Sequence, residues 1–286
     1  MNLRLVVFAF FFTLELIGQN GNQYQSIDFV LNNERMKASF AKVKNMIENG
    51  GFLTQDEASK KLISKQNKKI KLKKTKINQK ELEGADVYRK LLPSTVVLVT
   101  NSLRASGYII SSDGVCVTNY HVVKMYSSPN MKKNGLIALT HNNEPYFVTD
   151  ILATSPENDL AIVKIDTRGK VFSPLSLGSF LPEGNRVYVL GHPSHITYYF
   201  SEGIVAKNFI RNPEVLKEKE QCYMAITADY GIGASGAPVV DNKGNIVGTV
   251  STAKALYPNP NEKNNPQMVL RNTIPVIALK QLIEFD

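Results

Sequence analysis

One stretch decides the fold prediction: Gly233-Ala234-Ser235-Gly236-Ala237-Pro238, which is followed at once by two valines. Glycine adopts backbone conformations that are closed to other residues, so the chain can curl tightly around Ser235 and bring its N–H groups together. A serine hydroxyl is a poor nucleophile near neutral pH unless an adjacent base takes its proton. The turn therefore leads us to look for a histidine and for an acid that orients it.

Two candidates lie earlier in the chain. His121 belongs to Thr118-Asn119-Tyr120-His121-Val122-Val123, after a predicted hairpin, and Asp159 opens the apolar run Leu160–Ile165. A histidine accepts the serine proton, and a carboxylate holds the imidazole in the required tautomer. Each residue alone also fits an ordinary structural role, His121 at a strand end and Asp159 in a turn. Together their order, His then Asp then Ser, is that of chymotrypsin-type hydrolases and differs from the orders of α/β-hydrolases and subtilisin.

The sequence pattern from about Ala85 onward predicts an all-β fold. Short apolar runs recur between turn signals such as Asp113-Gly114, without intervening helical patterns. We expect two groups of six strands that divide near 173–182, and one closing helix over Ile274–Phe285. The expected strands are Thr95–Thr100, Ser106–Ile110, Val115–Thr118, Leu136–Thr140, Tyr146–Leu152, Leu160–Ile165, Val187–Leu190, Tyr198–Ala206, Cys222–Ala228, Ala237–Val240, Ile246–Ser251 and Met268–Leu270.

From about Leu92 to Pro275 the chain resembles the trypsin-like serine peptidases, most closely their HtrA (DegP-type) branch. The resemblance implies polypeptide substrates and two six-stranded antiparallel β-barrels, over about 93–175 and 180–273, with the active site between them. It implies a catalytic triad of His121, Asp159 and Ser235, and an oxyanion hole made by the N–H groups of Gly233 and Ser235. The segments that carry it are Ser106–Ile110, Asp113-Gly114, Thr118–Val123, Asp159–Ile165, Gly191-His192-Pro193, Gly203–Val205, the Ser235 turn and Ile246–Thr252.

The resemblance is incomplete at two places. Ala234 stands where trypsin-like zymogens have an acid that binds a newly freed N-terminus, so we expect no such activation step. Only eleven residues follow Pro275, so we expect no PDZ domain of the kind that many HtrA proteins carry.

The side-chain preference stays open between two alternatives. Asp229 lies six residues before the serine, the position that in trypsin selects Lys or Arg, whereas HtrA relatives usually accept small apolar side chains. Arg271 or Asn272, on a following strand, could reach Asp229 and cancel its charge. Ser251 and Thr252 match the strand that lines the pocket and pairs with substrate.

The N-terminal part differs in character from the rest. Residues 1–18 join a short positive start to the apolar run Leu5–Leu14, which predicts a secretory signal peptide, with an uncleaved anchor as the alternative. Residues 19–84 predict a helical pre-segment and a Lys-rich linker, in which Thr54-Gln55-Asp56-Glu57 fits a capping box. Residues 85–286 form the predicted peptidase domain. We therefore expect an exported protein, periplasmic or secreted.

Positive charge gathers in the linker. Ten lysines and no acid lie between Lys60 and Lys80, so the rest of the chain carries −1 against +9 for the whole. A run of like charges is typical of a solvated linker, and a weak contact with a polyanion or membrane surface is the alternative. The run lacks interleaved aromatics and arginines, so we expect no nucleic-acid partner.

The composition excludes several classes of protein. Two cysteines in 286 residues exclude a disulfide-stapled scaffold and a cysteine-built zinc site, and we expect Cys116 and Cys222 to be free thiols. Four histidines make no cluster of ligands, and we predict neither a metal nor a cofactor. The residues and the resemblance together predict a serine endopeptidase. The alternative is a catalytically weak protease-like module that attaches to a polyanion through its lysines.

Overall fold

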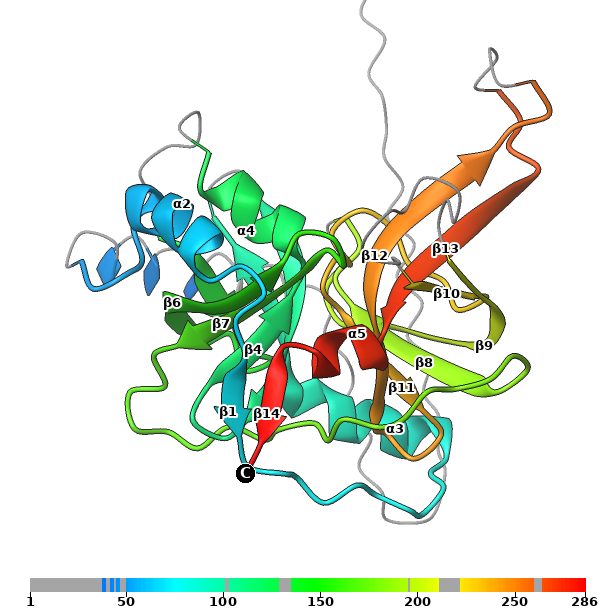
Figure 1. Ribbon diagram of the computed structural model, residues 1–286, viewed down its shortest axis with the longest axis horizontal. Helices are drawn as coiled ribbons and strands as arrows, with labels where there is room; N and C mark the ends of the chain where they lie inside the picture. The colour runs from blue at the N-terminus through cyan, green and yellow to red at the C-terminus, as the bar shows by residue number, and fades with distance from the viewer. Residues whose placement is uncertain are drawn as a thin grey trace, which may run out of the picture.

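Two closed barrels of six strands each lie side by side in the computed structural model (Figure 1). The structure describes residues 38–39, 42–43, 45–46, 50–100, 103–128, 135–194, 196–210, 222–259 and 264–286. The predicted signal peptide lies outside these residues. Among the described residues, no helix has the length and apolar content needed to cross a membrane.

The first barrel closes in the order β2-β3-β4-β7-β6-β5, and each neighbouring pair is antiparallel. Side chains such as Ile109, Cys116 and Val163 fill its interior. Both β2 and β4 are buried at every position. Their near-continuous apolar sequences fit this, because a strand that is buried on both faces needs apolar side chains on both. The strands are β2 (Thr95–Val99), β3 (Arg104–Ser111), β4 (Val115–Thr118), β5 (Ile137–Leu139), β6 (Pro145–Ser155) and β7 (Leu160–Ile165).

The second barrel closes in the order β10-β13-β12-β11-β8-β9, again with antiparallel pairs throughout. Val189, Met224 and Val250 lie in its interior. The β12–β13 hairpin extends well beyond the barrel (Figure 1, upper right). The strands are β8 (Arg186–Gly191), β9 (Tyr199–Ile210), β10 (Cys222–Ile226), β11 (Pro238–Asp241), β12 (Ile246–Leu256) and β13 (Met268–Pro275).

All twelve expected strands are confirmed, as is the antiparallel two-barrel fold. The end of the chain differs from the helix expected over Ile274–Phe285. Pro275 closes β13, α5 covers only Val276–Lys280, and β14 (Ile283–Phe285) follows. The chain is extended again at β14 because Ile283, which is 5% exposed, pairs with a strand from the N-terminal part and packs into the core.

The pre-segment begins, in its described part, with helical residues at 38–39, 42–43 and 45–46, and continues into α2 (Gln55–Ser64). The predicted capping box is confirmed. The Thr54 hydroxyl accepts from the Glu57 N–H at 3.3 Å, and the Glu57 carboxylate accepts from the Thr54 N–H at 2.9 Å. Ala58 and Leu62 then pack on the first barrel beside α4 (Tyr120–Tyr126).

The lysine-rich segment contains a short strand that the linker prediction did not include, while most of its lysines are exposed. Within it, β1 (Ile70–Leu72) pairs in parallel with β14, and Ile70 lies opposite Ile283. Leu72, 7% exposed, joins the core. Apolar residues alternate here with lysines, so one face of the segment packs on the barrels while the other carries charge.

One hydrophobic core joins the two barrels. It contains Tyr108 and Leu160 from the first barrel and Tyr188 and Ile274 from the second. Residues of α3 (Gly84–Leu91), β1, α5 and β14 complete it, and a single 3₁₀ turn, Leu92–Ser94, leads from α3 into β2. The N-terminal part and the last strand therefore help to fix how the barrels sit against each other.

Candidate active site

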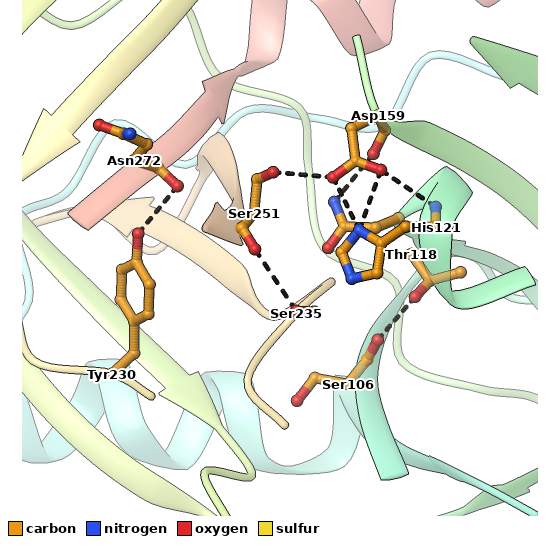
Figure 2. Close-up of polar contacts among 9 residues, drawn as sticks. Ser106, Thr118, His121, Asp159, Tyr230, Ser235, Ser251 and Asn272 are labelled. Carbon is orange, nitrogen blue, oxygen red and sulfur yellow. Dashed lines mark hydrogen bonds and ion pairs between the residues drawn. The ribbon is translucent and has the colours of Figure 1, made fainter. Parts of the chain in front are cut away.

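The candidate residues come together where the two barrels meet (Figure 2). His121 is the second residue of α4 rather than the end of a strand, and Asp159 directly precedes β7. Ser235 lies in the connection between β10 and β11. All three line one cleft of about 710 Å³, so the first barrel supplies two of the side chains and the second barrel supplies one.

Asp159 holds the imidazole of His121. The ring Nδ1 lies 3.0 Å from Oδ1 and 2.9 Å from Oδ2, and the His121 N–H donates to Oδ1 at 3.0 Å. A carboxylate can only accept, so Nδ1 carries the hydrogen and Nε2 is left able to accept a proton. Asp159 has a φ of 52°, a left-handed conformation that aspartate adopts more readily than most residues. The Asn119 amide secures this bend by donating to the Asp159 carbonyl at 2.9 Å.

Ser251 on β12 completes the surroundings of the acid. Its hydroxyl donates to Oδ2 of Asp159 at 2.7 Å, across the cleft from one barrel to the other. The Asp159 side chain is 17% exposed and that of His121 is 38% exposed. The acid is thus largely enclosed by its donors, while the imidazole faces the cleft.

The turn that carries Ser235 is tied to β3 by Ser106. The Ser106 N–H donates to the Ser235 carbonyl at 2.8 Å, and the Ser106 hydroxyl donates to the Gly233 carbonyl at 3.0 Å. The same hydroxyl accepts from the His192 N–H at 3.2 Å. These bonds hold the carbonyls of Gly233 and Ser235, and so tie down the turn that carries the two N–H groups expected to form an oxyanion hole.

Gly233 is required by this geometry. Its φ is 98°, and a Cβ added there would lie 2.6 Å from the His192 carbonyl oxygen. Within the described part of the chain, the N–H groups of Gly233 and Ser235 donate to no other group. Two unpartnered amides beside a serine can bind an oxyanion that forms there.

The Ser235 hydroxyl does not bond to His121 in this structure. It donates instead to the Ser251 carbonyl, at 3.4 Å (Figure 2). Catalytic hydrogen bonds are often loose in unliganded enzymes and tighten when substrate binds. Ser251 therefore contacts two of the three candidate catalytic residues, its hydroxyl reaching Asp159 and its carbonyl reaching Ser235.

Asp229 stands apart from the cleft. Its carboxylate pairs with the Arg271 guanidinium at 2.6 Å, and its side chain is 61% exposed. The cleft is lined instead by its neighbour Tyr230, whose hydroxyl bonds to the Asn272 carbonyl at 2.8 Å (Figure 2). The same hydroxyl lies 3.0 Å from the Thr252 carbonyl. Ser251 and Thr252 line the cleft where the sequence placed them.

His192 is a buried residue beneath the turn. Its Nδ1 accepts from the Tyr198 N–H at 3.0 Å, and its ring meets that of Tyr198 edge to face at 4.6 Å. Burial, with a smaller contribution from the Arg104 charge, lowers the pKa of His192 to about 3. The ring is therefore neutral over the physiological range. Cys116 and Cys222 are both free thiols, Cys116 buried and Cys222 half-buried.

Sequence reasoning missed three contributors to this region. Ser106 and Tyr230 were not singled out as site residues, and Ser251 was expected only to contact substrate. Serine and tyrosine are common, and nothing in the local pattern shows that Ser251 lies across from Asp159. Their roles depend on how the two barrels pack against each other, and the spacing of apolar residues in the sequence does not predict that packing.

The comparisons with known proteins agree with this geometry. Residues 105–248 match the family model described as a trypsin-like peptidase domain, a stretch that contains His121, Asp159 and Ser235. Protease Do-like 5, chloroplastic, of Arabidopsis thaliana is 29% identical over 52% of this chain and 47% of its own length. A probable periplasmic serine endoprotease, DegP-like, of Chlamydia muridarum is 27% identical over 54% of this chain and 29% of its own. The matched stretch is thus less than half the length of these relatives.

A solved structure shares the fold. The crystal structure of Deg5 superposes with a TM-score of 0.54 at 21% identity, over 68% of this chain and 89% of the other. Sequence family, fold and the arrangement of the cleft residues point the same way. This chain belongs to the trypsin-like peptidase family, and its homologues there are HtrA- and DegP-type serine proteases.

Proposed function

We propose that this protein is a serine endopeptidase that hydrolyses peptide bonds through an acyl-enzyme intermediate. The observation that carries the proposal is the arrangement of Ser251, Asp159 and His121 beside Ser235, with two unpartnered amides in the same turn. Each part has a defined use in acyl transfer.

In this mechanism Ser235 attacks the substrate carbonyl carbon while Nε2 of His121 takes the hydroxyl proton. The new C–O bond pushes the carbonyl electrons onto oxygen, and the N–H groups of Gly233 and Ser235 bind that oxyanion. His121 then gives its proton to the leaving amine as the peptide C–N bond breaks. Asp159 keeps Nδ1 protonated and stabilises the imidazolium throughout. Water repeats the sequence and releases the acid.

Substrate binding itself can free the serine. The Ser251 carbonyl, which now accepts from Ser235, lies on the edge of β12 that is unpaired in the described structure beyond Val250. An extended substrate that pairs with this edge would offer its own N–H to that carbonyl. The Ser235 hydroxyl would then turn toward Nε2 of His121.

Covalent labelling with a fluorophosphonate probe tests the proposal. We expect the intact protein to label and Ser235→Ala to remain unlabelled. Ser127→Ala, which alters a half-buried serine at the end of α4 outside the cleft, should label like the parent and serves as the matched control. Failure of Ser235-dependent labelling in protein whose circular dichroism is native would defeat the proposal.

We also propose a preference for small apolar side chains at P1, the residue whose carbonyl is attacked. The ion pair with Arg271 occupies Asp229, which is not among the residues that line the cleft. Tyr230 does line it, and its hydroxyl bonds to the Thr252 carbonyl. Reporter peptides ending in Val or Ala should be cleaved faster than those ending in Lys or Arg. The preference should survive Asp229→Ala, whereas efficient cleavage after Lys that this variant abolishes would restore the trypsin-like alternative.

Export remains part of the proposal. It is supported by the pattern of residues 1–18 and by the Chlamydia muridarum relative, which is named a probable periplasmic endoprotease. N-terminal sequencing of the mature protein from its native host should begin after Gly18. Recovery of the intact N-terminus in a membrane fraction would favour the anchor instead.

The lysines suggest a second, compatible function. Eight of them are exposed, and none forms an ion pair with another described residue. We propose a weak contact with anionic lipid, worth about 1 kcal/mol per lysine near the surface. Flotation with vesicles containing phosphatidylserine should retain the protein at low salt and release it at high salt. The exposed lysines are Lys60, Lys68, Lys69, Lys71, Lys73, Lys74, Lys76 and Lys80.

A further inference from the structure

Glu157 gives the cleft a charge that the proposed mechanism does not use. Among the described residues that line the cleft, the acids and imidazoles are His121, Asp159 and Glu157. Asp159 is engaged by His121 and Ser251, as described above. Glu157 lies on the same wall, two residues before Asp159, and is half-buried.

The hydrogen bonds to Glu157 are long, and their donors are uncharged. Its Oε1 accepts from the Gln66 amide at 3.3 Å, and its Oε2 accepts from the Ser155 hydroxyl at 3.4 Å. No lysine or arginine of the described chain lies within ion-pair distance of it. Lys61 of α2 is paired with Asp150, at 2.5 Å. A carboxylate held this way retains room for a cation supplied from the cleft.

The position of Glu157 relative to a bound peptide follows from β12. The Ser251 carbonyl faces Ser235, so a substrate strand would lie along this edge of β12 with its scissile bond at the serine. Successive side chains of an extended strand point to opposite sides. If P1 points toward the second barrel beside Tyr230, then P2 and P4 point toward the first-barrel wall that holds Glu157.

We propose that Glu157 selects substrates that carry Lys or Arg on the face opposite P1, at P2 or P4. This inference rests on the proposed peptidase function. It assigns the basic preference to a different side chain and a different subsite from Asp229, whose charge Arg271 already neutralises. Gln66 contributes indirectly, since it holds the Glu157 carboxylate from the pre-segment.

Positional scanning of reporter peptides tests this. With Ala or Val fixed at P1, we expect Lys or Arg at P2 or P4 to raise kcat/KM about two- to fivefold over Gln at the same position in low salt, the range for a partly exposed ion pair. The gain should shrink at high ionic strength. Glu157→Gln should abolish it, and Glu157→Lys should move the preference to Asp or Glu. Glu284→Gln, an exposed acid of β14 that does not line the cleft, is the matched control and should leave the preference unchanged.

The outcomes separate this inference from the function on which it rests. Turnover without a basic preference at P2 or P4 overturns the inference and leaves the peptidase intact. So does a preference that persists in Glu157→Gln. If no peptide is cleaved and no fluorophosphonate labelling depends on Ser235, the proposed function fails and the inference fails with it.

Discussion

At the scale of single residues, Ser251 acts through two groups that can be separated experimentally. Its hydroxyl donates to Asp159, whereas its carbonyl belongs to the edge along which substrate would lie. Ser251→Ala removes the hydroxyl and its bond to Asp159 but keeps the backbone carbonyl. A hydrogen bond to a charged group contributes about 1.5 kcal/mol, so we expect kcat to fall about tenfold. KM should change little, because the backbone edge is kept. A rise in KM of about tenfold with an unchanged kcat would contradict these separate roles for the hydroxyl and the carbonyl.

The Gly233 turn offers a second prediction at this scale. Gly233→Ala places a Cβ 2.6 Å from the His192 carbonyl and forces the peptide group to move, taking one oxyanion donor with it. We expect kcat to fall by about 100-fold or more, the loss seen when one such donor is removed. Gly231→Ala is the matched control, because a Cβ there meets only the Pro193 Cβ, at 3.7 Å. Similar kinetics for the two variants would show that the turn is not the anion site.

His192 predicts a pH dependence of stability. Burial lowers its pKa to about 3 in the folded protein, so between that value and the ordinary value of 6.5 only the unfolded chain binds the proton. The contribution of His192 is thus fully present above pH 6.5 and is lost as the pH falls toward 3. The free energy of unfolding should drop by about 1.4 kcal/mol per pH unit in this window from this residue. Denaturant titrations at several pH values should show that the free energy of unfolding changes less per pH unit in His192→Asn than in the parent.

An NMR titration of the parent protein provides the check that needs no variant. The His192 ring should keep its neutral chemical shifts down to pH 4.5, well below the value of 6.5 at which an exposed histidine titrates. A midpoint near 6.5 would contradict the prediction.

At the scale of elements, α2 supports the helix that carries His121. Leu62 is 5% exposed and packs on the same cluster as Val122 and Tyr126 of α4. Leu62→Ala should lower the free energy of unfolding by about 2–5 kcal/mol, the usual range for a buried leucine. Activity should also fall before global unfolding, because α4 loses its support. Ile63→Ala, at a position 76% exposed on the same helix, should leave both unchanged.

The strands of both barrels were predictable because their signal is local. Runs such as Val115–Thr118 and Leu160–Ile165 are apolar at nearly every position, and turn residues bound them. The closing helix was predicted too long. Leu279, Leu282 and Ile283 do recur at helical spacing. That spacing equally suits a short helix followed by a strand whose partner lies far back in the sequence.

The site was predictable to the extent that its residues lie in motifs. His121, Asp159 and Ser235 each belong to a recognisable segment, and all three line one cleft. The ion pair between Asp229 and Arg271 was foreseen only as an alternative. Glu157 belongs to no motif, and its described contact with the pre-segment is the bond from Gln66, a residue far back in the sequence.

At the scale of the whole molecule, β1 and β14 make the lysine-rich segment a part of the folded body. Limited digestion with trypsin should therefore leave Lys69, Lys71 and Lys73 uncut in the native protein, and cleavage there should follow the rate of unfolding. Leu72→Asp, which places a charge in the core, should open the segment to rapid cleavage. Rapid cutting of the parent at these lysines would show that β1 is not paired as described.

The pairing of β1 with β14 also bears on how the chain is made. During synthesis β1 emerges before either barrel exists, and its partner appears only after the strands of both barrels. Such a distant contact forms late, because the intervening chain must first become compact. Until then Ile70 and Leu72 have no strand to join, and the core shared by the barrels lacks one side. We therefore expect chains truncated before Ile283 to bind chaperones strongly in pulse-chase experiments, although both barrels are complete in sequence.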